Sequence, residues 1–385
     1  MLYFDHNATT PLLPDARAAW LEAVEKYVGN PSSPHRLGQR AELALQGARE
    51  QLAALLGCDA MDTVWTSGAT ESNNMVFHHF ARSLGAEAEV WVSGVEHPCV
   101  LAAADSHFPK RAHRIPVTRD GVVELDWVRE GFQKRKPALV AVMAANNETG
   151  VLQPWREVLA LCRAADVAFF CDAAQWIGKF RARELGGCDF VSGCAHKFGG
   201  PKGVGFLKCP ASPRLRPLLV GGKQEDGRRA GTENVASVLS MMAALAARER
   251  SLAAGEQQSR LSWRERFERD LLKELPGSEI VGSGAERLWN TVSALMPEAD
   301  CQQRWVVKLD KFGCAVSTGS ACASGREEPS HVLAAMGRTA SEAGRVLRFS
   351  SGWETTQGDW RSLLDGLGKV QASASNKTIA SRKAR

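Results

Sequence analysis

The chain carries at residues 188–203 the stretch Cys188-Asp189-Phe190-Val191-Ser192-Gly193-Cys194-Ala195-His196-Lys197-Phe198-Gly199-Gly200-Pro201-Lys202-Gly203. It begins as a short apolar run, typical of a buried strand, and continues through small residues to a His-Lys pair and a glycine-rich loop. A lysine that follows the end of a strand and enters a tight loop is well placed for covalent chemistry on a carbonyl group. Lys197 is therefore the first candidate catalytic residue.

Short, continuously apolar runs recur through the first 250 residues and alternate with helical patterns. Such runs predict strands buried on both faces, and the alternation predicts a mainly parallel, doubly wound α/β sheet. The predicted strands lie at 63–66, 89–93, 113–117, 138–144, 167–171, 189–192 and 204–208. The predicted helices between and before them lie at 15–27, 37–56, 71–84, 97–106, 125–134 and 155–165.

The pattern changes after about residue 235 and predicts a smaller α+β domain. Helices are predicted at 235–250, at 260–274 and from about Pro329, and strands near 279–281, 290–295, 305–315 and 345–350. The extended N-terminal arm is expected to complete this domain. The expected division is a large domain at 15–250, a small domain made of 1–14 and 251–371, and a disordered basic tail at 372–385.

Composition excludes several classes of protein. The 385 residues are 44% hydrophobic with a net charge of +5, and no basic stripe interleaved with aromatic residues is present, so nucleic acid is not an expected partner. No signal peptide and no run of about 18 apolar residues occurs, so no membrane association is expected. The 10 cysteines form no C-x-x-C pair and no zinc-site spacing, so no metal site and a reducing, cytoplasmic location are predicted.

Polar side chains follow five of the predicted strands at their carboxyl ends. These clusters are Ser67–Glu71, Glu96–His97, Asn146–Glu148, Asp172–Gln175 and His196–Lys197. Ligands of open α/β sheets bind outside this edge, so the five clusters predict one site there. Neither G-x-x-x-x-G-K-[ST] nor a G-x-G-x-x-G after the first strand is present, which argues against a nucleoside triphosphate or a dinucleotide.

Three of these clusters also have a purely structural interpretation. Ser67–Thr70 can cap the following helix, or its backbone N–H groups and hydroxyls can hold a phosphate. Asp172 can cap a helix, or its carboxylate can pair with a protonated pyridine nitrogen and make the ring an electron sink. His97 can cap a helix or fill the core, or it can stack on a planar ring and transfer protons.

Cys322 stands apart from the other cysteines. It lies in a small-residue loop at 317–325 with no bulky apolar neighbours. Most free cysteines are inert packing residues, but this one lacks the neighbours that packing requires. An exposed thiol on a flexible loop is a candidate nucleophile.

With these motifs together, the chain resembles the pyridoxal-phosphate-dependent cysteine desulfurases of the class V aminotransferase family over nearly its whole length. The matching segments are Tyr3–Thr10, Gly29–Ser33, Thr66–Asn73, Glu96–His97, Asn146–Gly150, Asp172–Gln175, His196–Gly203, Arg229–Asn234, Ser317–Ser324 and Arg348–Ser350. The resemblance implies an aspartate-aminotransferase-like (fold type I) large domain. The continuous Ser-Thr-Gly-Ser-Ala-Cys loop is similar to the long-loop group, which serves iron–sulfur assembly, nitrogenase maturation or tRNA thiolation.

The resemblance also implies residue roles and a homodimer. Lys197 would hold pyridoxal 5'-phosphate as a Schiff base, His97 would stack on its ring and move protons, and Cys322 would take the sulfur of L-cysteine as a persulfide. Asp172 would pair with the pyridine nitrogen, and Gln175 and Asn147 would hydrogen-bond near the ring's phenolic oxygen. The implied phosphate ligands are Ala69, Thr70, Cys194, His196 and, from the second subunit, Thr232. Arg348 and Asn147 would bind the substrate carboxylate.

The same resemblance predicts a reaction. The amine of cysteine displaces Lys197, Lys197 removes the Cα proton, and the Cys322 thiolate attacks the substrate sulfur, so that alanine leaves. The persulfide then passes to an acceptor or scaffold protein. Two alternatives stay open: a selenocysteine lyase on the same scaffold, and a non-catalytic sulfur-relay or scaffold protein.

One residue departs from the family pattern. The family usually has serine at the position of Cys194, as a phosphate ligand. A thiol is a weaker hydrogen-bond donor than a hydroxyl. We therefore expect looser phosphate binding in this chain than a serine would give.

Overall fold

The computed structural model describes residues 1–383 except 213, 299–301 and 319–329, and it describes only the backbone of 302–304 and 373–383. Its centre is a seven-stranded sheet in the order β2-β8-β7-β6-β5-β3-β4, in which β8 alone is antiparallel to its neighbours. The predicted mainly parallel α/β fold is confirmed. The strands are β2 (Thr63–Thr66), β3 (Val90–Ser93), β4 (Ala112–Ile115), β5 (Leu139–Ala141), β6 (Ala168–Asp172), β7 (Phe190–Cys194) and β8 (Gly205–Lys208).

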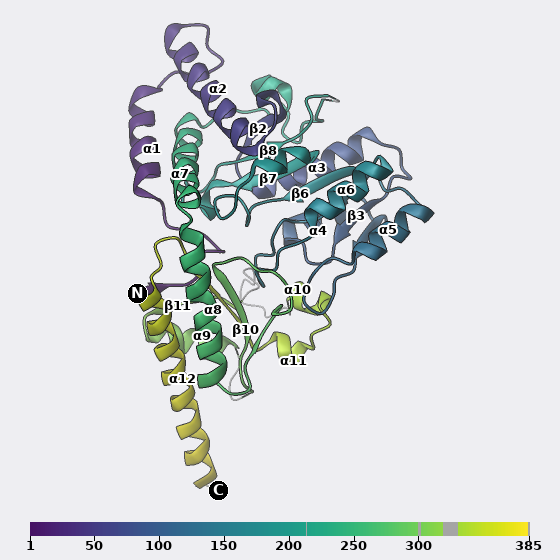
Figure 1. The fold of residues 1–385 in the computed structure, drawn as a ribbon. Coiled ribbons are helices and arrows are strands. Elements are labelled where there is room, and N and C mark those ends of the chain that lie inside the picture. The colour runs from purple at the N-terminus through teal and green to yellow at the C-terminus, as the bar shows by residue number, and fades with distance from the viewer. Residues whose placement is uncertain (213, 299–301, 319–329, 384–385) are drawn as a thin grey trace.

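Helices cover both faces of this sheet, as Figure 1 shows. They are α1 (Pro14–Lys26), α2 (Arg36–Leu56), α3 (Ala69–Ser83), α4 (Pro98–His107), α5 (Leu125–Lys134), α6 (Trp155–Ala165) and α7 (Val235–Ala253). The 3-10 helices are η1 (Ala60–Asp62), η2 (Arg183–Gly187), η3 (Ala195–Lys197) and η4 (Gln224–Gly227). Helix α2 illustrates the cause: Leu45, Ala48 and Leu52 recur on its buried face, and Gly57 ends it in the left-handed conformation.

A second, smaller body follows α7 in the chain. Figure 1 shows α7 and α8 running one after the other from the large sheet into this part of the molecule. Its elements are α8 (Glu256–Glu274), β9 (Glu279–Ile280), β10 (Thr291–Leu295), α9 (Gln302–Lys311), β11 (Cys314–Ala315), α10 (His331–Ala335), α11 (Ala340–Ala343), β12 (Val346–Ser350) and α12 (Gln357–Lys383). Strands β12, β10 and β9 form an antiparallel sheet.

The N-terminal arm joins this smaller body. Strand β1 (Leu2–Tyr3) pairs with β11, and Phe4 is fully buried in the core cluster that also contains Phe267, Phe349 and Trp360. A separate core cluster, between Leu13 and Leu245 in sequence, fills one side of the large sheet. These two cores favour the proposed division into a large domain at 15–250 and a small domain made of 1–14 and 251–371.

Two sequence predictions differ from the structure. The strand predicted at 305–315 is wrong for most of its length, because 302–311 form helix α9 and only 314–315 form a strand. Trp305 and Leu309 are both fully buried and lie four residues apart, which is the spacing of a helix face. The segment 372–385 was expected to be disordered, but α12 continues to Lys383 through a stretch that contains neither glycine nor proline after Gly368.

Candidate active site

A cavity of about 450 Å³ opens at the carboxyl ends of the parallel strands. Each of the five polar clusters predicted to meet at this edge contributes at least one residue to its wall. The predicted site residues that line the cavity are Ala69, Thr70, His97, Asn147, Asp172, Gln175, Cys194, His196 and Lys197. Arg348 and Thr232 do not line it within one chain, and Cys322 lies outside the described residues.

Lys197 ends the 3-10 helix η3 that follows β7. Its Nζ donates to the backbone oxygens of Asn7 (2.6 Å) and Ala8 (2.9 Å). Burial lowers the pKa of Lys197, and the charge of Arg348 acts in the same direction. A lysine with a lowered pKa has a larger neutral fraction near pH 7, which is the form that attacks a carbonyl group.

Asp172 ends strand β6 and is not a helix cap, because no helix follows it. Its Oδ2 accepts a hydrogen bond from Asn73 Nδ2 (2.8 Å), and its Oδ1 accepts one from the Ala174 backbone N–H (3.0 Å). These bonds hold a buried carboxylate at the cavity wall. Such a carboxylate can pair with a protonated ring nitrogen.

His97 caps a helix and also lies on the cavity wall. It is the N-cap of α4, because its Nδ1 accepts the backbone N–H of Cys99 (3.3 Å), and its ring also lines the cavity. The Cys99 thiol lies 3.0 Å from the same Nδ1. Burial lowers the pKa of His97, so that the ring is mainly neutral near pH 7. Because Nδ1 accepts from the backbone, the ring proton belongs on Nε2.

The N-terminus of α3 forms one end of the cavity. Its N-cap is Gly68, which offers no side-chain hydrogen bond to the first turn. The N–H groups of this first turn and the positive end of the helix dipole can therefore bind an anion. A side chain at Gly205 would place its Cβ 2.7 Å from the Cα of Gly68, so the close approach of β8 to this turn requires glycine.

His196 lies on the cavity wall near this end. Its Nδ1 is 3.3 Å from Thr9 Oγ1. Burial lowers the pKa of His196 to about 4, with a further contribution from Lys197. A neutral imidazole can still donate one N–H to a phosphate oxygen.

Cys194, at the end of β7, is buried at the same anion-binding end. The backbone N–H of Ala69 donates to its sulfur, and burial raises the pKa of the thiol to about 11. The group therefore stays protonated near pH 7 and is a weak donor.

We expect Cys194→Ser to raise the affinity for the cofactor by about 3- to 10-fold. The reason is that a hydroxyl donates a stronger hydrogen bond to the phosphate than a thiol does. A cofactor titration followed by absorbance measures this, and equal affinities in the two proteins would contradict it.

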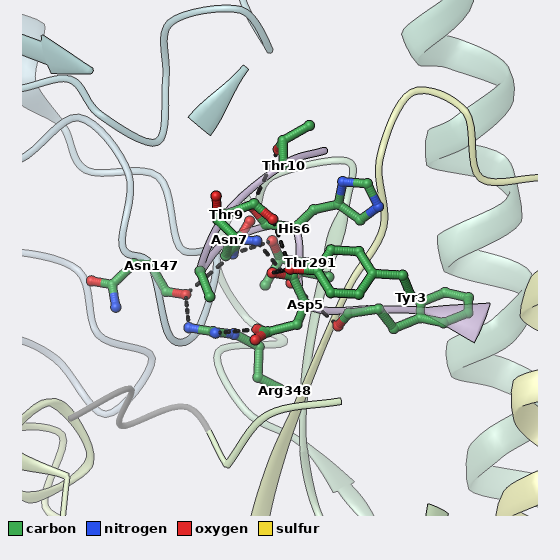
Figure 2. Close-up of polar contacts among 12 residues, drawn as sticks. Tyr3, Asp5, His6, Asn7, Thr9, Thr10, Asn147, Thr291 and Arg348 are labelled. Atoms are coloured by element: carbon green, nitrogen blue, oxygen red, sulfur yellow. Dashed lines mark hydrogen bonds and ion pairs between the residues drawn. The ribbon is translucent and has the colours of Figure 1, made fainter. Parts of the chain in front are cut away.

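The sequence predicts that the N-terminal arm completes the small domain, but it indicates no role for the arm in the site. The arm runs along the cavity floor, and Figure 2 shows Asn7 and Thr9 at the centre of its polar contacts. Besides binding Lys197, the Asn7 backbone oxygen accepts from Gln175 Nε2 (2.9 Å). The Asn7 side chain donates to the Asn147 backbone oxygen (3.1 Å) and to Thr291 Oγ1 (2.9 Å). Asn7 therefore connects the small domain, through Thr291, to the residues of the cavity wall by hydrogen bonds.

Arg348, on β12, is completely buried behind Asn147. Its Nη1 donates to the Asn147 backbone oxygen (2.9 Å) and its Nη2 pairs with Asp5 Oδ1 (2.7 Å), as Figure 2 shows. The guanidinium thus lies next to the cavity and carries a carboxylate partner from the arm. The proposed binding of the substrate carboxylate by Arg348 stays a prediction.

The walls of this cavity fit pyridoxal phosphate. An amine and a carboxylate lie on the same cavity, as a Schiff base and a protonated pyridine nitrogen require, and the first turn of α3 lacks a side-chain cap where a phosphate would bind. The remaining structural alternative for Ser67–Thr70, a plain side-chain cap, is excluded because Gly68 occupies the N-cap position.

Comparison with known proteins agrees with this fit. The Aminotransferase class-V family matches residues 2–363, so the chain belongs to that family. It is accordingly a pyridoxal-phosphate-dependent enzyme of fold type I.

The individual proteins that are similar to this chain belong to a narrower group than the whole family. A protein named cysteine desulfurase from Cereibacter sphaeroides is 37% identical over 95% of this chain and 94% of its own length. A solved NifS-like protein from Rickettsia africae superposes with a TM-score of 0.87 at 28% identity, covering 97% of this chain and 99% of that one. A structure described as SspA in complex with cysteine has a TM-score of 0.77 at 26% identity and covers 91% and 98% of the two chains.

Proposed function

We propose that this protein is a cysteine desulfurase that converts L-cysteine to L-alanine and forms a persulfide on Cys322. The observation that carries the proposal is the meeting of Lys197, Asp172 and His97 on one cavity in a chain that is similar, over nearly its full length, to proteins with that name.

Lys197, Asp172 and two backbone oxygens are proposed to act at the Cα step of the reaction. Lys197 holds the cofactor and, once the substrate amine has replaced it, accepts the Cα proton at Nζ. The Asn7 and Ala8 backbone oxygens accept two N–H bonds of this amine and orient its lone pair. Asp172 keeps the ring nitrogen protonated. When bound, pyridoxal phosphate supplies the electron sink for the charge that develops at Cα.

The sulfur step belongs to Cys322. Its thiolate attacks the substrate sulfur, the Cβ–S bond breaks and an S–S bond forms. The products are alanine and the Cys322 persulfide, so atoms balance without an external oxidant. Arg348 and Asn147 are proposed to hold the substrate carboxylate, and His97 is proposed to return protons through Nε2.

The direct test is product formation. The cofactor-loaded protein, incubated with L-cysteine and a thiol reductant, is expected to yield alanine and sulfide in equal amounts. L-Serine, which has the same skeleton without sulfur, is the control and should yield neither product by this route. A protein that carries the bound cofactor but forms no alanine from cysteine would overturn the proposal.

We further propose a homodimer in which Thr232 completes the phosphate site of the partner subunit. Thr232 is exposed, and it lies just before α7, against which α1 packs. Exposed apolar side chains occur in and near α1 and in the loop before Thr232, among them Leu21, Val28 and Val220. Analytical ultracentrifugation should give the mass of two chains. A monomer with full cofactor affinity would contradict the role of Thr232.

The partner that receives the sulfur, and the pathway it serves, are proposed only as a class: an acceptor or scaffold protein for iron–sulfur clusters, tRNA thiolation or a similar product. No helix in the described part of the chain has the length and apolar character needed to cross a membrane. A cytoplasmic location stays a prediction.

A further inference from the structure

Lys179 is a buried amine directly behind the proposed cofactor site. Its side chain is 4% exposed, and among the described residues it has no carboxylate partner. Its Nζ instead donates to two amide oxygens, Oε1 of Gln175 and Oδ1 of Asn7 (3.4 Å). Burying an ammonium group without a counter-ion is costly. A lysine kept in this position therefore calls for a reason beyond packing.

Burial lowers the pKa of Lys179 well below its usual range, and the charges of Lys197 and Arg348 lower it further. The other titratable groups that face it are Cys194 and His6. Whether charged or neutral, the amine keeps N–H groups that can be donated. Its hydrogen bonds to the two amide oxygens hold in both states.

The contact with Lys179 decides which way the Gln175 amide points. The side chain of Gln175 has one oxygen that accepts and one nitrogen with two N–H donors. Lys179 Nζ donates to the Gln175 oxygen, and Gln175 Nε2 donates one N–H to the Asn7 backbone oxygen (2.9 Å). Gln175 also lines the cavity, so its second N–H is the group left for a ligand there.

We propose that Lys179 is a positioning residue, which locks the Gln175 amide so that an N–H donor faces the phenolic oxygen of pyridoxal phosphate. This inference rests on the proposed function. An N–H donor stabilises the ionised form of that oxygen, whereas a rotated amide would present an oxygen and disfavour it. Lys179 acts only through Gln175 and touches neither the cofactor nor the substrate.

The test is the absorbance spectrum of the cofactor-loaded protein at fixed pH. Lys179→Met keeps an unbranched side chain of similar length but cannot donate. It is expected to lower the ratio of the visible band to the near-ultraviolet band about fivefold, because one oriented hydrogen bond is lost. A lysine that merely fills space would leave this ratio unchanged.

A double-mutant cycle shows whether the effect passes through Gln175. In a Gln175→Leu background, Lys179→Met is expected to change the ratio no further. Lys208→Met is the matched control, because Lys208 is also buried and donates to a backbone oxygen, that of Cys188 (2.7 Å), without lining the cavity. It should leave the spectrum as it is.

Lys179→Gln is the second variant, in case the methionine variant does not fold. Its shorter amide is expected to shift the ratio in the same direction by less. An unchanged spectrum in a folded Lys179 variant, or an equal shift in the Gln175→Leu background, overturns the inference. A wild-type protein that shows no visible band with pyridoxal phosphate would instead refute the proposed function, so the two failures are distinguishable.

Discussion

Replacing Lys197 with alanine is expected to abolish the visible absorbance of the bound cofactor and nearly all turnover of cysteine. Lys197 lies on the cavity wall, and its amine donates to the backbone oxygens of Asn7 and Ala8. Its loss removes the covalent link and also the base at Cα, and loss of a general base alone costs about 10²–10⁴-fold in rate. Absorbance spectra and alanine release measure the two effects.

Two comparisons make this result specific. Lys208→Met removes a buried lysine that does not line the cavity and should keep both the absorbance and the turnover. Borohydride reduction followed by peptide mapping should place the cofactor on the peptide that contains Lys197 in the unmodified protein. A Lys197→Ala protein that is still yellow and still makes alanine would remove this residue from the mechanism.

The position of Lys197, Asp172 and His97 was predictable because it follows from topology alone. Continuous apolar runs indicate a parallel sheet, and a parallel sheet places the residues after each strand at one edge. The prediction needed only the approximate end of each strand. Errors of one or two residues in the predicted bounds still left His97, Asp172 and Lys197 at or just after the end of a strand, at the same edge of the sheet. The cavity therefore contains the predicted clusters.

The residues that were missed depend on contacts between distant parts of the chain. Asn7 meets Lys197 across 190 positions, and nothing near Asn7 in the sequence indicates that partner. Lys179 appears in sequence as an ordinary charged residue after a glycine, and only its burial beside Gln175 gives it a role. Helix α9 was missed because its two adjacent valines and its tryptophan also favour a strand, and packing against the small domain decided otherwise.

Replacing Cys322 with alanine is expected to separate cofactor binding from sulfur transfer. The residues proposed to hold the cofactor, among them Lys197 and Asp172, all remain in place, so the visible absorbance should be retained. Turnover of cysteine should fall by several orders of magnitude, because the substrate sulfur then has no thiolate to accept it. Single-turnover release of alanine, measured beside the absorbance spectrum, reports both quantities.

Cys58→Ala provides the matched control, since Cys58 is a partly exposed free cysteine away from the cavity wall, and burial raises its pKa to about 11. It should turn over cysteine at the normal rate.

The same pair of variants separates a cysteine desulfurase from a selenocysteine lyase. A selenocysteine lyase would release alanine from selenocysteine without Cys322, because selenium leaves more readily than sulfur. Full turnover of cysteine by the Cys322→Ala protein would exclude a persulfide on this residue as an obligatory step.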